Sequence, residues 1–120
     1  SMSGAFHAAE IFAGESGKIW EDLFPSISEA FGDRKEKTRT ANDLFVMAEN
    51  FCAARIRELP FFYFDCGAED SFLPVNERFA KILRRRIAHE FKIFSGSHDW
   101  NYWDARIERI LDLVADSFKA

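Results

Sequence analysis

The sequence lacks a basic excess, a long apolar run and a secretory leader. Lys and Arg number 16 against 20 Asp and Glu, so the net charge is -4. This argues against a general nucleic-acid binder, which is usually basic. The longest dense apolar stretch, Leu59–Phe64, is far shorter than the ~20 residues of a membrane span. No basic segment followed by an apolar one opens the chain, so no signal peptide or membrane partner is expected, and the cytoplasm is the default location.

The sequence also lacks the spacings of a metal or cofactor site. Its three histidines, His7, His89 and His98, are scattered and form neither an HxxxH nor an HExxH pair. Cys52 and Cys66 make neither a CxxC motif nor a disulfide framework, and we expect two buried or half-buried thiols. No glycine loop of the phosphate-binding kind occurs. We therefore predict no metal and no cofactor.

What the sequence does contain is enough apolar material for one core. Hydrophobic residues make up 48% of the 120 residues, charged residues 30%, and there are 14 Phe. This balance is typical of a globular chain, and the length suits one domain better than two. We predict a single domain over residues 1–120.

The first half of the chain predicts helices. An apolar stripe indicates a short helix or two within Ile19–Ile27, and the charged stretch Gly32–Thr40 is predicted to be a solvated connector. Thr40 and Asp43 have capping-box spacing, and the apolar pattern behind them predicts a helix that runs to about Arg55.

The second half predicts strands that alternate with helices. Leu59–Phe64 and His89–Phe94 are short and apolar, as in strands of a parallel sheet. A helix that begins near Pro74 should bury Phe79, Ile82 and Leu83, and Arg84–Arg86 follow it, either as an anion site or simply as cations at a helix end. The last helix carries an apolar stripe of Ile107, Ile110, Leu111, Val114 and Phe118. This order predicts an α/β fold with right-handed crossovers.

Chemistry in such a fold is expected beyond the carboxyl ends of the strands. The loop after the first strand carries Asp65, Glu69 and Asp70, and the loop after the second carries His98 and Asp99. If the strands are neighbours, an acid and a histidine meet there, as in the acid–His half of a Ser-His-Asp triad. The alternative is that His98 and Asp70 are ordinary turn residues.

A nucleophile is missing from this picture. The sequence has no G-x-S-x-G elbow. Ser95 and Ser97 are too close to His98 in the chain, and Ser71 directly follows Asp70 without an elbow. Cys66 is better explained as a buried strand-end thiol than as a nucleophile.

Two segments resemble a known family. "FFYFDCGAEDSFLPVNERFAKIL" and "AHEFKIFSGSHDWNYWDARI" resemble the C-terminal part of the esterase D-like branch of the α/β-hydrolase superfamily, which includes S-formylglutathione hydrolases and tributyrin-type esterases. That branch shows D-x-G-x-x-D-x-F-L, then G-G-H-x-W-x-x-W. The first pattern is matched by Asp65, Gly67, Asp70, Phe72 and Leu73, and the second by Gly96, His98, Trp100 and Trp103, with Ser97 at the usual second glycine.

The resemblance implies a partial α/β-hydrolase fold with the last two or three strands of a mainly parallel sheet. It implies Asp70 as triad acid and His98 as triad base of a serine carboxylesterase that hydrolyses short-chain esters or thioesters. The serine would lie in a missing N-terminal half, so we expect the chain alone to be inactive. "SGAF" (Ser3–Phe6) is similar to the segment after the strand that follows the nucleophile helix.

Several expectations depend on this resemblance. Phe72, Trp100 and Trp103 are candidate substrate contacts, although the two tryptophans also suit packing of the last helix against the His98 turn. The open sheet edge should pair with the missing half or with a second copy of the chain. The alternative function is a non-catalytic α/β interaction module with a vestigial Asp–His pair.

Overall fold

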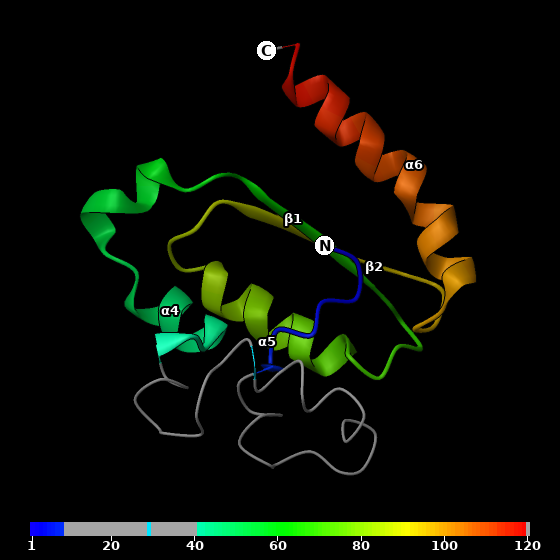
Figure 1. Cartoon of the computed structure of the whole chain (residues 1–120), viewed down its shortest axis with the longest axis horizontal. Helices are drawn as coiled ribbons and strands as arrows, with labels where there is room; N and C mark the ends of the chain where they lie inside the picture. The colour runs from blue at the N-terminus through cyan, green and yellow to red at the C-terminus, as the bar shows by residue number, and fades with distance from the viewer. Residues whose placement is uncertain (9–28, 30–40, 120) are drawn as a thin grey trace.

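The computed structural model describes residues 1–8, 29 and 41–119. Its helices and strands alternate along the chain, as Figure 1 shows. They are α4 (Leu44–Asn50), the 3₁₀ turn η2 (Ala53–Glu58), β1 (Phe62–Gly67), α5 (Leu73–Leu83), β2 (His89–Phe94) and α6 (Trp100–Ser117). The predicted order of helix, strand, helix, strand, helix is confirmed.

The sheet is parallel, as predicted. β1 and β2 run side by side in a register from Phe62 opposite His89 to Gly67 opposite Phe94. The start of the chain lies along the other edge of β1, where Met2 forms a parallel bridge with Asp65. The Ser3 N–H donates to the Asp65 carbonyl oxygen at 2.8 Å. β1 therefore lies in the middle, with β2 on one side and the short segment at the start of the chain on the other.

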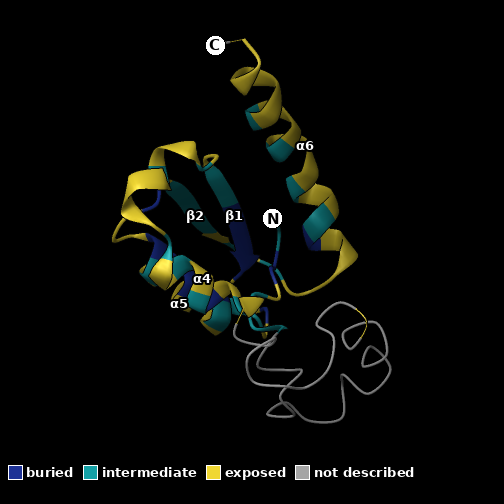
Figure 2. Cartoon of the chain, turned by 60° about the vertical axis from the view of Figure 1, so that its left-hand side comes forward, coloured by how far each residue is buried: buried dark blue, intermediate teal, exposed yellow. Residues whose placement is uncertain are grey.

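The core lies between the sheet and the helices α4 and α5. Figure 2 shows these helices together on one side of the strands, with buried residues where they meet. Phe79 of α5 stacks on Phe6 at 4.3 Å between ring centroids, and Phe64 of β1 stacks on Phe91 of β2 at 4.9 Å. The buried cluster consists of Phe45, Phe64, Phe79, Ala80, Leu83 and Ile87. The predicted α5 stripe of Phe79, Ile82 and Leu83 faces this core.

Helix α6 stands apart from this core. In Figures 1 and 2 it extends away from the sheet and is joined to the body by its first turns. Its buried residue is Tyr102. The predicted stripe is largely exposed, with Ile107 at 40%, Leu111 at 60%, Val114 at 47% and Phe118 at 85%. No helix in the described part of the chain is both long enough and apolar enough to cross a membrane.

The predicted helix after Thr40 was wrong at its end. α4 begins behind Asp43, whose carboxylate accepts from the N–H groups of Phe45 and Val46, so Asp43 is the cap itself. The helix stops at Asn50 rather than near Arg55, because Phe51 takes an extended ψ of 131°. Only Phe45 of α4 is buried, so further helical turns would gain little stabilisation from packing.

The first strand also lies further along than predicted. β1 covers Phe62–Gly67 instead of Leu59–Phe64. Leu59 still donates its N–H to Ile56 at the end of η2, and Pro60 has no N–H to offer a sheet. The chain therefore joins the sheet only after these two residues, and the strand extends to Gly67.

One further expectation changes in the structure. Cys66 is fully buried, but Cys52, which directly precedes η2, is exposed. Arg86 donates to the Glu49 carbonyl oxygen and so links the end of α5 to α4. The predicted helix in Ile19–Ile27 and the connector Gly32–Thr40 lie outside the described residues.

Candidate active site

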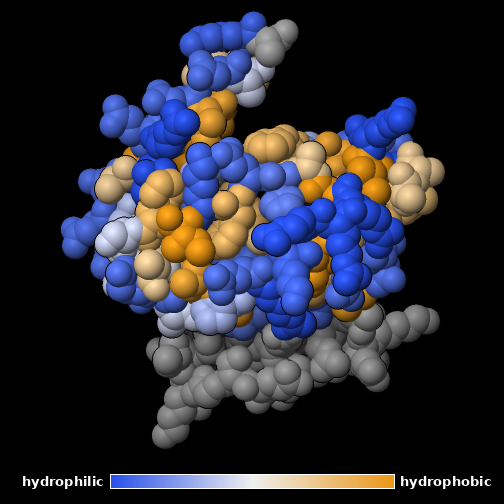
Figure 3. All heavy atoms as spheres, turned by 180° about the vertical axis from the view of Figure 1, so that it is seen from behind, coloured by the Kyte–Doolittle hydropathy of each residue, from blue (hydrophilic) through white to orange (hydrophobic). Residues whose placement is uncertain are grey.

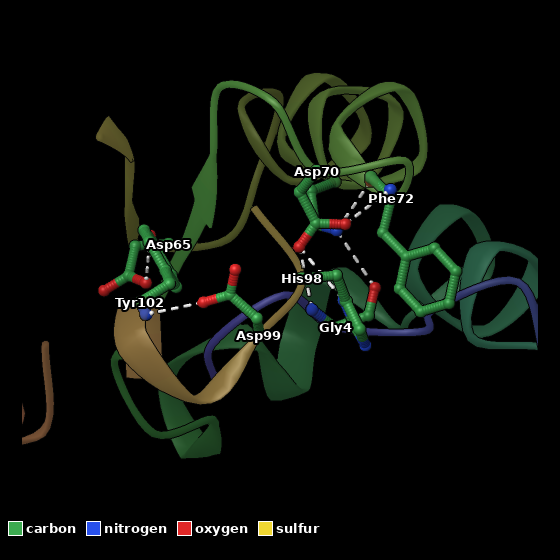
Figure 4. A network of polar contacts seen from close by, with 8 residues as sticks. Gly4, Asp65, Asp70, Phe72, His98, Asp99 and Tyr102 are labelled. Carbon is green, nitrogen blue, oxygen red and sulfur yellow. Dashed lines mark hydrogen bonds and ion pairs between the residues drawn. The ribbon is translucent and has the colours of Figure 1, made fainter. Parts of the chain in front are cut away.

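The candidate site lies at the carboxyl ends of β1 and β2. The Asp70 loop leaves β1 and the His98 turn leaves β2, and because the strands are parallel neighbours both segments arrive at the same edge. The Asp70 Oδ2 atom lies 3.0 Å from the His98 Nδ1 atom. Figure 4 shows the two side chains pointing toward one another. The structure thus brings together the acid and the histidine on which the sequence interpretation depends.

Asp70 is held rigidly on its side of the pair. Its side chain is fully buried, whereas the His98 side chain is 40% exposed. The other carboxylate oxygen, Oδ1, accepts from the Phe72 N–H at 2.8 Å. The Phe72 N–H therefore fixes the direction in which the carboxylate points, and His98 meets an acid that is already oriented.

The balance of interactions keeps Asp70 ionised. Burial raises the pKa of the Asp70 carboxyl, but the neighbouring Ser3 hydroxyl, the Phe72 N–H and His98 together bring that pKa below its ordinary value. An ionised carboxylate can only accept hydrogen bonds. It follows that the His98 Nδ1 atom carries the hydrogen in the neutral ring, and Nε2 is left as the acceptor. This is the tautomer that a general base needs.

The two loops are also tied together directly. Glu69 donates its N–H to the Gly96 carbonyl oxygen at 3.1 Å, and the Gly96 N–H donates to the Glu69 carboxylate at 2.6 Å. Glu69 is adjacent to Asp70, and Gly96 comes two residues before His98. This reciprocal pair holds the segments that carry the acid and the histidine at a fixed separation.

The remaining acids named from the sequence have other roles. Asp65 is buried in β1 and accepts from the hydroxyl of Tyr102 at 2.8 Å. Asp99 caps α6 by accepting from the Tyr102 N–H at 3.0 Å. Of the four acids near the strand ends, Asp70 is the one that contacts His98.

The aromatic candidates surround His98 unequally. Phe72 approaches the His98 ring edge-on at 4.7 Å between centroids, and Trp103 does so at 5.0 Å. Trp100 contacts Trp103 at 5.2 Å and is 79% exposed. Met2, both tryptophans and Ile107 help to line a shallow groove of about 150 Å³. Phe72 and Trp103 therefore hold the imidazole between them, while Trp100 lies further out.

Two contributors to the site were missed from the sequence. Ser3 is buried beside Asp70 and has a left-handed φ of 49°, because the chain turns sharply there from the sheet toward α5. Asn76 is fully buried, and its side chain bonds the backbone of Gly4 in both directions, at 3.2 and 3.0 Å. An amide on the apolar face of α5, three residues before Phe79, was the available signal for Asn76. Ser3 left none.

Comparison with known proteins finds a likeness among solved structures. No protein-family model matches this chain, and no curated protein matches it. Among solved structures, a ferulic acid esterase superposes with a TM-score of 0.55 and 26% sequence identity. The likeness covers 62% of this chain and 29% of that one, so the chain spans under a third of the esterase's length. The structure is therefore a partial α/β-hydrolase fold, similar to part of an esterase.

Proposed function

We propose that this chain is the part of a serine carboxylesterase that supplies the catalytic acid and base. The observation that carries the proposal is the 3.0 Å contact between the buried Asp70 side chain and the partly exposed His98 side chain at the strand ends. The likeness to a ferulic acid esterase supports ester hydrolysis as the reaction. The resemblance of the two sequence motifs to the esterase D-like branch supports short-chain esters or thioesters as the substrate class.

In this proposal His98 is the general base. Its Nε2 atom would take the proton from a serine hydroxyl as that serine attacks the ester carbonyl, and would then give the proton to the leaving alcohol or thiol. Asp70 would hold the Nδ1 hydrogen and stabilise the imidazolium that forms. Phe72 and Trp103 flank the ring, and Trp100 is the candidate for the acyl-group wall.

The serine and the oxyanion hole would come from outside these 120 residues, since the sequence has no nucleophile elbow. Losing even one oxyanion donor typically costs ~10²–10³ in rate. We therefore expect the 120-residue chain by itself to have no esterase turnover. A short-chain p-nitrophenyl ester is a suitable substrate, and turnover that His98→Ala abolishes would contradict this expectation.

Two surfaces of the chain suit the rest of such a domain. One is the outer edge of the segment at residues 1–3, which pairs with β1 on its other side and with no strand of the described residues on its outer side. The other is the exposed stripe of α6, and hydrophobic side chains are visible in Figure 3 where this helix leaves the body. Open edges and apolar faces of this kind promote association. We expect the isolated chain to self-associate, and light scattering that shows a monomer at high concentration would argue against it.

The decisive experiment uses the reading frame that contains this chain. The proposal requires a G-x-S-x-G elbow upstream of Ser3, and a protein expressed with that segment should hydrolyse the p-nitrophenyl ester. His98→Ala should then reduce kcat by at least ~10³-fold, whereas His89→Ala, a half-buried histidine bonded to the Ile87 carbonyl oxygen, should not. A native start at Met2 with no elbow would overturn the proposal in favour of an interaction module.

A further inference from the structure

A second carboxylate, Asp65, is buried in β1 but does not contact His98. Its Oδ1 atom accepts from the Tyr102 hydroxyl at 2.8 Å, and its Oδ2 atom accepts from the Tyr63 hydroxyl at 3.0 Å. The Arg106 Nε atom lies 3.9 Å from Oδ2. A fully buried charge is costly unless donors and a counter-charge accompany it. Asp65 has both, and two of these partners, Tyr102 and Arg106, belong to α6.

Tyr102 also contacts the His98 turn. It is 4% exposed, and its ring packs so closely on Gly96 that a Cβ atom there would lie 2.6 Å from the Tyr102 Cδ2 atom. Its N–H donates to the Asp99 carboxylate at 3.0 Å. Tyr102 therefore fixes the turn at Gly96 and at Asp99, and His98 lies between these two points.

We propose that Asp65 and Tyr102 form a positioning pair that sets the place of His98 relative to Asp70. The buried hydrogen bond joins β1, which leads into the Asp70 loop, to α6, which follows the His98 turn (Figure 4). Neither residue touches the reacting atoms, so the pair acts through the turn. Its importance for catalysis rests on the proposed function, but its effect on the His98 ring does not.

The alternative is that the pair merely stabilises the fold. Tyr63 separates the two explanations, because it donates a hydroxyl to the same carboxylate but lies on β1 itself. Tyr102→Phe and Tyr63→Phe each remove one hydroxyl from Asp65 and keep the ring. If Asp65 only needs donors, both variants should act alike. If Tyr102 positions the turn, only Tyr102→Phe should disturb His98.

The test is ¹⁵N NMR of the histidine ring nitrogens in the 120-residue chain, with the His98 signals assigned by their loss in His98→Gln. The original chain should show the Nδ1–H tautomer. Tyr102→Phe should shift both ring nitrogens toward the values of a tautomer mixture, whereas Tyr63→Phe should leave them in place. The inference is overturned if neither variant moves the His98 signals, or if both move them equally.

Folding and function are controlled separately. If Tyr102→Phe fails to fold because Asp65 keeps an unmet charge, the double variant with Asp65→Asn removes that charge, still lacks the hydrogen bond, and should show the same shift. In the longer, active protein Tyr102→Phe should lower kcat by up to ~10²-fold with KM unchanged. Failure of the proposed function would remove that activity altogether and leave the NMR result standing.

Discussion

Gly67 and Gly96 meet backbone to backbone at the end of the sheet. A Cβ atom on Gly67 would lie 2.0 Å from the Gly96 carbonyl oxygen. Gly96 itself has a φ of 135°, a backbone angle that residues with a side chain rarely adopt. The absence of both side chains lets the Asp70 loop and the His98 turn approach closely. The 3.0 Å contact of the candidate pair depends on this approach.

Gly67→Ala should therefore damage the site. The added methyl group meets backbone atoms, which cannot move aside as a side chain can, so we expect a loss of about 1–3 kcal/mol in the free energy of unfolding and displacement of the His98 turn. Denaturant unfolding and the His98 NMR signals measure the two effects. The exposed neighbour Ala68→Ser adds an atom in open solvent and serves as control. Equal stability of the two variants would contradict the close approach.

Glu69→Ala should loosen the link between the loops. The Gly96 N–H then loses its 2.6 Å acceptor, and losing about 1 kcal/mol of hydrogen bonding should speed exchange of that amide roughly fivefold. Hydrogen exchange at Gly96 measures this directly. Glu69→Gln keeps an acceptor oxygen and should remain close to the original rate. Glu77→Ala, which removes an exposed carboxylate of α5, should leave the exchange rate of the Gly96 amide unchanged. An equal effect of Glu77→Ala would refute the hydrogen bond between Gly96 and Glu69.

Asp70→Asn should change how stability depends on acid. The pKa of Asp70 is lower in the folded chain than its ordinary value of 3.8, so the unfolded chain binds more protons as the pH falls. The stabilisation is present above that ordinary pKa and is lost as the pH falls through it toward the folded value. Unfolding curves of the original chain should therefore weaken in acid more steeply than those of Asp70→Asn. Asp112→Asn, an exposed carboxylate on α6, is the matched control, and identical acid profiles for the two variants would argue against the shift.

The two thiols should react at very different rates. Cys66 is fully buried, and burial, with the nearby Asp70 charge, raises its pKa to about 11. Cys52 is exposed. Because the thiolate is the reactive form, an alkylating reagent at neutral pH should label Cys52 quickly and Cys66 only after unfolding. Mass spectrometry of the native and denatured chain gives the count, with Cys52→Ser as control. Rapid double labelling of the native chain would contradict the buried position of Cys66.

Local pattern determined much of the fold. The apolar run His89–Phe94 forms a strand with the predicted bounds, and Pro74 lies in the first turn of α5, because these features depend on nearby residues alone. The start of β1 was misplaced by three residues, since Leu59 is as apolar as a strand residue. Leu59 and Pro60 are excluded from the sheet only because the Leu59 N–H donates to the Ile56 carbonyl oxygen and Pro60 has no N–H.

The candidate site was predictable to the level of its segments. The sequence alone placed an acid-bearing loop and a histidine turn after two strands predicted to be parallel, and parallel strands that are neighbours bring such loops to the same edge. Residue pattern alone left four neighbouring acids open and the family resemblance singled out Asp70, but only the tertiary structure decided that Asp70 contacts His98. That choice depends on contacts between distant parts of the chain, namely Gly67 against Gly96 and Tyr102 against Asp65, and no local pattern encodes such distances.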